Sequence, residues 1–267
     1  METLEEVLLA YKGGLVFLWL LVFFVLERAF PAEPLIKIGG WFEKFFPARV
    51  RRNIGLWFCN LILSPLVVIP LTAWATSHAI GWRPDFLSGS AGIIFDLILL
   101  DGLIYWWHRL NHETPFLWRF HEIHHLDTNL DTTSALRFHF GEVLLSAFMR
   151  VFVVIVFDIP LVSVIIFETI LLISTLFHHS NVQLPEKLEK VLSLVIITPA
   201  IHWVHHHALR HDTDSNYGTV FSFWDRIFRS KSKGQRTIGM PIGVEGAQDK
   251  GFLQLLIRPF KKVLWYK

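Results

Sequence analysis

The sequence predicts an all-α integral membrane protein with about four transmembrane helices, one of them counted as a helical hairpin, and a cytoplasmic helical cap. Three observations support this fold class. Apolar residues make up 52% of the chain and charged residues only 18%. Several apolar runs approach the 20 residues that a helix needs to cross a bilayer. Most of the 14 histidines lie in short runs at the ends of those apolar segments.

Composition also limits the classes of function. The formal net charge is +2, and no basic block of the kind that binds nucleic acid is present. The single cysteine, Cys59, excludes an intrachain disulfide framework. We expect N-terminal membrane helices over residues 1–92, a catalytic domain over 93–230, and a loop with an interfacial helix over 231–267.

The first expected span covers residues 14–30, where 15–26 are wholly apolar. The connection that follows, residues 30–53, is basic and carries four cations: Lys44, Arg49, Arg51 and Arg52. Short loops rich in Lys and Arg stay on the cytoplasmic side of the membrane. This loop therefore sets the orientation of the whole chain.

The second expected span covers residues 54–80, and Pro65 and Pro70 predict a kink within it. His78 near its far end is expected at the interface. The third span, residues 93–107, returns to the cytoplasmic side and contains Asp96 and Asp101. Carboxylates inside a membrane span are costly and are usually paired.

Residues 143–177 form a long apolar tract that is broken at Asp158-Ile159-Pro160, which predicts a helical hairpin. Glu168 within it is expected to face protein. The hairpin returns the chain to the cytoplasmic side, so every histidine run falls on one face of the membrane. Residues 184–197 and 252–266 are expected to be amphipathic helices at the interface.

The histidine runs have the spacing of metal ligands on helices. Residues three and four apart share a helix face. Eight imidazoles fit this spacing: His108, His112, His121, His124, His125, His202, His205 and His206. Because one ion takes about four to six protein ligands, eight suit two ions. Two iron ions held mostly by nitrogen would form a redox centre able to activate dioxygen.

Two other interpretations compete. His121-Glu122-Ile123-His124-His125 matches the H-E-x-x-H motif of zinc metalloproteases, in which Glu122 would be the general base. That interpretation leaves the other histidine runs without a role. A non-catalytic protein that binds or transports metal would need polar residues along a span, and the spans offer Asp96, Asp101 and Glu168.

The sequence around these runs resembles the fatty acid hydroxylase/sterol desaturase superfamily over roughly residues 95–230. The segments that carry the likeness are 101–112, 117–125, 133–139, 177–181, 198–206, 214–218 and 224–228. The arrangement is most similar to the bacterial sterol-desaturase-like group and to alkylglycerol monooxygenase. Members of the superfamily are membrane di-metal oxygenases that act on lipids.

The resemblance adds His179, which precedes Ser180 and Asn181, as a ninth ligand. It implies two Fe ions, with Zn possible in purified protein, that hydroxylate, desaturate or oxidatively cleave a sterol, fatty acyl or alkyl-ether lipid with O2. No flavin or haem module is visible, so electrons would come from a separate donor of the cytochrome b5, ferredoxin or pterin type. Residues expected to support the ligands through hydrogen bonds are Asp101, Glu113, His139, His178 and Asn181.

Overall fold

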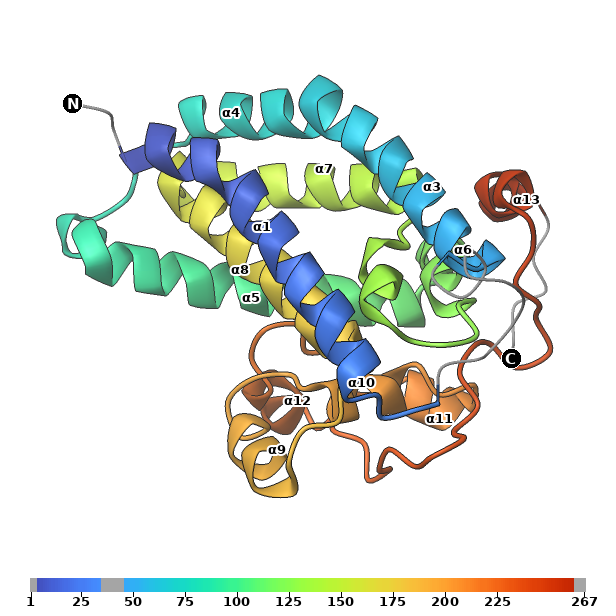
Figure 1. Cartoon of the computed structure of the whole chain (residues 1–267). Helices are drawn as coiled ribbons and strands as arrows, with labels where there is room; N and C mark the ends of the chain where they lie inside the picture. The colour runs from blue at the N-terminus through green and yellow to red at the C-terminus, as the bar shows by residue number, and fades with distance from the viewer. Residues whose placement is uncertain (1–3, 35–45, 262–267) are drawn as a thin grey trace.

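A computed structural model of the chain describes residues 4–34 and 46–261, and its regular structure is helical (Figure 1). Five helices among these residues are long and apolar enough to cross a membrane. The expectation of about four such helices counted the hairpin once, and both of its arms are long enough. The elements, in chain order, are α1 Leu4–Ala29, α3 Ala48–Leu63, η1 Ser64–Val68, α4 Ile69–Ser77, η2 Asp85–Leu87, α5 Gly89–Glu113, α6 Pro115–His125, η3 Thr132–Leu136, α7 Phe140–Phe157, α8 Leu161–His179, α9 Glu186–Leu192, α10 Pro199–His205, α11 Arg210–Thr213, α12 Phe223–Ile227, α13 Phe252–Ile257 and η4 Arg258–Phe260.

The second span is interrupted where its prolines occur. Helices α3 and α4 are joined through a π-helical turn, Ser64–Val68, that contains Pro65. A proline removes one backbone donor and pushes away the carbonyl of the preceding turn, and a π turn accommodates that loss. The predicted kink is confirmed, and His78 ends α4 with its ring stacked on Trp74.

The predicted hairpin is also confirmed. Helix α7 ends at Phe157, Asp158 takes a left-handed conformation with φ of 52°, and Pro160 precedes the first residue of α8. A left-handed residue followed by a proline stops one helix and starts the next. The return arm α8 carries His178 and His179 in its last turn.

Two of the carboxylates inside the spans, Asp96 and Glu168, form ion pairs. Arg83 holds Asp96 through two hydrogen bonds of 2.9 and 3.0 Å, and Ser163 donates a third. Glu168 lies between Lys12 and Arg150, at 2.6 and 2.7 Å. These contacts confirm the expectation that Glu168 faces protein. Ion pairing lowers the cost of placing a charge in an apolar medium.

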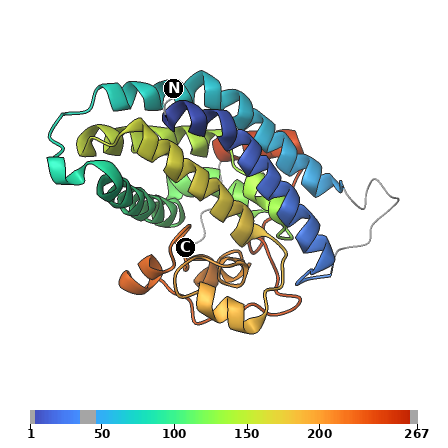
Figure 2. The ribbon, with the colours of Figure 1, turned by 60° about the vertical axis from the view of Figure 1, so that its left-hand side comes forward.

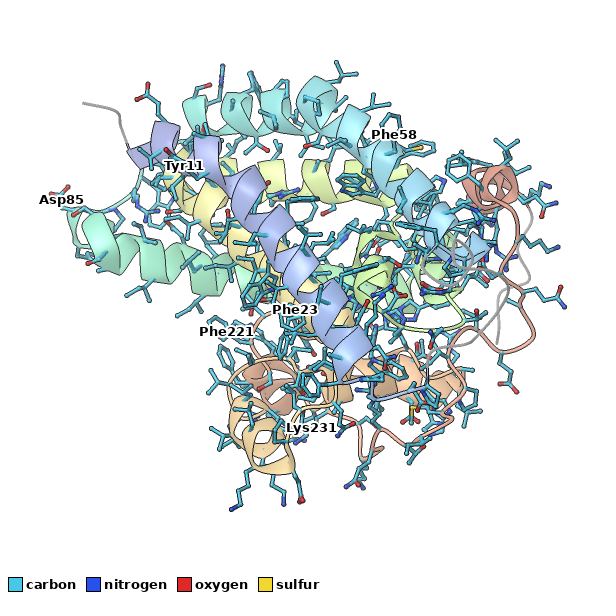
Figure 3. The ribbon with its side chains drawn as sticks, viewed as in Figure 1. Tyr11, Phe23, Phe58, Asp85, Phe221 and Lys231 are labelled. Carbon is cyan, nitrogen blue, oxygen red and sulfur yellow. The ribbon has the colours of Figure 1, made fainter. Side chains whose placement is uncertain are left out.

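The cap gathers at one end of the long helices. Figure 2 shows the orange segment, which includes α10–α12, packed against the ends of α1 and α8. Figure 3 places Lys231 on this cap and Tyr11 and Asp85 at the opposite end of the bundle. The third span continues as a helix to Glu113, so His108 and His112 lie on its last turns rather than in a following loop.

Part of the basic connection lies beside the cap, since Arg49 contacts Asp127 at 2.8 Å; Lys44 falls outside the described residues. Helix α9 is shorter than the expected 184–197 helix, because Ile196 leaves it to form a bridge with Phe221. The described C-terminal helix covers 252–257 of the expected 252–266, and a 3₁₀ turn follows it. Residues 262–267 lie outside the described part.

Candidate metal centre

The structure brings nine predicted imidazoles together in two adjoining groups at the cap end of the bundle. Within each group the candidate ligand nitrogens lie within 4.8 Å of one another. Group one consists of His108, His112, His121, His125 and His205. Group two consists of His124, His179, His202 and His206. Each of the nine residues is 9% exposed or less, so both groups are buried.

The two short histidine helices each contribute to both groups, and they do so in opposite senses. Helix α6 gives His121 and His125 to group one and His124 to group two. Helix α10 gives His202 to group two and His205 to group one, and His206, which caps its C-terminal end, joins group two. Residues four apart on a helix are rotated by only about 40°, whereas residues three apart are rotated by about 60° in the other direction. Spacing alone, which puts residues three and four apart on one helix face, predicts that each run directs all its imidazoles one way. For the runs of α6 and α10 that expectation is wrong, because each run contributes to both groups.

The hydrogen bonds of His124 and His179 show that a cation fits between their rings. His124 Nδ1 donates to the Arg137 carbonyl at 3.1 Å, and His179 Nδ1 donates to the Thr175 carbonyl at 2.8 Å. A neutral imidazole that donates from Nδ1 has a lone pair at Nε2. The two Nε2 atoms nevertheless lie 3.0 Å apart, which places two lone pairs against each other.

A proton is the first cation to consider between these rings. Burial away from water, together with the neighbouring imidazoles, holds the pKa values of His124 and His206 well below their usual range. Burial also lowers the pKa of His205 to about 3. These imidazoles are neutral at pH 7, the form in which histidine binds metals. A metal ion therefore suits the centre better than a proton does.

Buried ring nitrogens without hydrogen-bond partners also support a metal ion. Within the described part of the chain, buried ring nitrogens of five members lack a hydrogen-bond partner: both nitrogens of His112, Nδ1 of His125, His202 and His206, and Nε2 of His205. Buried polar atoms without partners are rare, because each one loses its bond to water on folding. Metal coordination would satisfy Nε2 of His205 and one nitrogen of His112. In group two it is the Nε2 atoms of His124, His179, His202 and His206 that face one another, at 3.0 to 3.1 Å between neighbours, and they supply four donors to a second ion.

Several candidate ligand imidazoles are oriented by groups that the sequence did not point to. The Tyr217 carbonyl accepts from His108 Nδ1 at 2.8 Å, and the Ser215 carbonyl accepts from His205 Nδ1 at 2.6 Å. The Glu142 carboxylate lies 2.8 Å from His121 Nδ1. Such partners fix the tautomer and orientation of a metal-binding imidazole. Backbone carbonyls leave no mark in a sequence, but a glutamate in the first turn of an apolar span could have been noticed.

The residues expected to support the ligands lie as follows. Asp101 accepts from the Trp224 indole at 2.8 Å and from the backbone of Val220 and Phe221, so it fixes the loop after the last histidine run. Glu113 pairs with Arg109 on the surface.

The other three make different contacts. His139 uses both ring nitrogens, accepting from Gly141 N–H and contacting the Leu256 carbonyl at 3.0 Å. Asn181 exchanges two 2.9 Å bonds with the backbone of Glu33. His178 is buried with its ring centre 4.0 Å from that of His202, outside both groups.

The geometry does not support the metalloprotease interpretation. Glu122 is 1% exposed, and both of its carboxylate oxygens accept from Arg258, at 2.6 and 2.8 Å. A general base must reach the water or substrate proton that it removes. A bidentate pair with arginine occupies this carboxylate instead.

Comparison with known sequences agrees with the site. A sequence model described as fatty acid hydroxylase matches residues 93–230, which is more than half of the chain. The chain therefore belongs to the fatty acid hydroxylase family.

Individual relatives are more distant. The chain is 28% identical to the ornithine lipid hydroxylase OlsE of Rhizobium tropici, over 74% of this chain and 59% of that protein. It is 24% identical to rat (Rattus norvegicus) cholesterol 25-hydroxylase over 86% of this chain and 78% of that one. It is 31% identical to human (Homo sapiens) alkylglycerol monooxygenase, over 46% of this chain and only 27% of that protein. No solved structure matches the chain.

Proposed function

We propose that the chain is a membrane-bound oxygenase in which the nine imidazoles hold two iron ions and a lipid is hydroxylated with O2. The observation that carries the proposal is the pair of buried histidine groups at one end of an apolar helical bundle. The relatives are named for hydroxylation or monooxygenation of an ornithine lipid, of cholesterol and of alkylglycerol. Their shared chemistry supports a lipid substrate and leaves its headgroup open.

Iron is the metal that we propose for the working enzyme, and zinc is expected to occupy the same imidazoles in purified protein. When bound, two iron ions supply the reductive activation of dioxygen that an unactivated C–H bond requires. Hydroxylation consumes O2, two electrons and two protons, and it yields the alcohol and water. The electrons come from a separate donor.

The chain's own residues provide orientation and exclusion of water. The carbonyls of Tyr217 and Ser215 hold His108 and His205 in one tautomer, and Glu142 does the same for His121. The low exposure of all nine imidazoles keeps bulk water from the reacting lipid. The lipid enters from the bilayer between the spans.

One opening on the cap reaches a ligand. A pocket of about 310 Å³ is lined by polar and charged residues, among them His112, Arg109, Asp214 and Tyr217. Asp214 Oδ1 lies 3.5 Å from His112 Nδ1. Because lipid is unsuited to such a lining, we assign this pocket to the exchange of protons and water and to the approach of the donor.

The histidine groups are proposed to face the cytoplasm. Positive charge gathers near the cap, where Arg49 and Arg52 form ion pairs. Four lysines are exposed on it: Lys187, Lys190, Lys231 and Lys233. Cations in short loops near span ends remain on the cytoplasmic side. Labelling of single cysteines introduced at Lys231 and at Asp85 in intact cells would determine which end faces outward.

The test of the activity uses oxygen isotope. Protein loaded with Fe²⁺ in lipid nanodiscs is given a chemical reductant, ¹⁸O2 and a lipid panel that contains ornithine lipid, cholesterol and alkylglycerol. We expect one ¹⁸O atom in a lipid product, and none with His124→Ala. Desaturation would give a product two hydrogens lighter with no label. Absence of ¹⁸O and of desaturation from every lipid in the panel, with both ions bound, would overturn the proposed activity on these lipids.

A further inference from the structure

We propose that Glu122 and Arg258 are positioning residues, through which the C-terminal segment 249–260 holds helix α6 in place from the side away from the histidine groups. The inference rests on the proposed metal centre. It assigns a role to the one motif, H-E-x-x-H, that the proposed function leaves unused. Its consequence is that the ions are retained through a contact that touches neither of them.

The ion pair joins the ligand helix to a distant part of the chain. Glu122 lies beside His121, and Arg258 is 136 positions further along. Arg258 donates from Nε and from NH2 to the two carboxylate oxygens. A bidentate arginine pair has a defined geometry, and removal of one partner leaves a buried charge without compensation. The ion pair therefore favours one rotation of α6 about its axis and one position of α6 along that axis, relative to the C-terminal segment.

A second set of contacts repeats this connection through Arg137. Its guanidinium is fully buried, donates from Nε to the Ile123 carbonyl at 2.7 Å, and donates from NH2 to Asp249 at 2.7 Å. The Arg137 carbonyl accepts from His124 Nδ1. Asp249, at the start of the C-terminal segment, thus anchors the residue that orients a ligand of group two.

Apolar packing completes the attachment. Leu255 is fully buried in a cluster with Leu56, Ile123 and Leu126, and Ile123 lies in α6. The opposite side of the segment is exposed and apolar, with Leu253 at 73%, Ile257 at 47% and Phe260 at 66%. Figure 1 shows α13 beside α3 and α6, away from α1 and α8. The segment has a polar attachment to α6 and an apolar side suited to the bilayer surface.

The test measures how fast metal leaves the protein. Full-length protein in nanodiscs is loaded with Co²⁺, whose visible absorption reports coordination, and is mixed with excess chelator. The variants are Arg258→Gln, Arg258→Lys, Glu122→Gln and the double glutamine variant. A matched control, Arg83→Gln, breaks another bidentate arginine–carboxylate pair at the far end of the bundle.

We expect Arg258→Gln and Glu122→Gln each to release Co²⁺ at least about tenfold faster, as loss of partners around a metal site does. The double variant should release Co²⁺ no faster than the faster of the two single variants, because both substitutions remove the same contact. Arg258→Lys should restore part of the retention and part of the absorption band. The Arg83→Gln control should release metal at the wild-type rate for each folded molecule.

Each contrary result has a distinct meaning. Equal release from wild type and Arg258→Gln, with two ions bound at the start, overturns the positioning role alone. Equally fast release from Arg83→Gln also overturns it, because general loosening would then explain the effect. A wild-type chain that binds no Co²⁺ overturns the proposed metal centre and the positioning role together.

Discussion

The two histidine groups differ in size, and this difference predicts unequal effects of removing one imidazole. Group two has four members, including His202, whereas group one has five, including His112. Loss of His202 leaves three imidazoles, one fewer than a tetrahedral ion requires. Loss of His112 still leaves four. Zinc bound to group two should therefore be the more sensitive to a single substitution.

The size of the effect follows from ordinary zinc affinities. A site of four protein ligands binds zinc with about 10–16 kcal/mol, so one ligand accounts for roughly 3 kcal/mol. At about 1.4 kcal/mol per factor of ten, His202→Ala should weaken zinc binding in group two by about 100-fold. His112→Ala should weaken group one by about tenfold or less, because four imidazoles remain.

The assay counts zinc ions per chain in nanodiscs at a fixed free zinc concentration, chosen so that wild type binds two. We expect one ion in His202→Ala and two in His112→Ala. His78→Ala is the control, because His78 lies at the end of α4 and stacks on Trp74. Loss of both ions in His202→Ala, or loss of one in His112→Ala with none lost in His202→Ala, would refute the assignment of two separate groups.

Three further predictions concern the loop after the last histidine run and the effect of pH. Asp101→Asn should lower the free energy of unfolding by about 2–3 kcal/mol, measured in mixed detergent, because a neutral amide replaces a charged acceptor of three hydrogen bonds. Gly218→Ala should lower the free energy of unfolding by about 1–3 kcal/mol and weaken metal binding by group one, because a Cβ there would lie 2.8 Å from Asp225 and Ile197. The control Gly251→Ala should change neither quantity, since no atom lies within 4 Å of a Cβ at that position. Metal-free protein should lose stability as pH falls below about 6.5. A histidine in the unfolded chain takes up a proton in this range, whereas buried His205 in the folded chain stays neutral because its pKa is about 3. His205 alone should contribute about 2 kcal/mol between pH 6.5 and pH 5, and His205→Ala should flatten that part of the profile.

The order of helices could be predicted because membrane helices leave a strong local signal. An apolar run of suitable length must be helical in a bilayer, where each backbone group needs a partner within its own segment. Asp158-Ile159-Pro160 marked the hairpin turn, and Pro65 marked the irregular turn in the second span. The helices of the cap were less predictable, because short helices such as α9 depend on tertiary contacts for their ends.

The nine imidazoles were identified from their spacing and from family resemblance, but their division into two groups was not. Helical spacing places His121, His124 and His125 on neighbouring faces and leaves undecided which ring joins which group. The sequence also did not predict the ion-pair partner of Glu122. Arg258 is 136 residues away, and an H-E-x-x-H match gives no information about a residue on a distant segment.

Sequence alone determined that this chain is a helical membrane protein whose histidine runs stand at the ends of apolar segments, because hydropathy and helical periodicity are properties of neighbouring residues. Only the tertiary structure decided that α6 and α10 share their imidazoles between two groups, that carbonyls of Tyr217 and Ser215 orient two of them, and that Glu122 faces Arg258. Those arrangements depend on how distant helices are rotated against each other. Packing across the whole fold sets that rotation, and no local pattern records it.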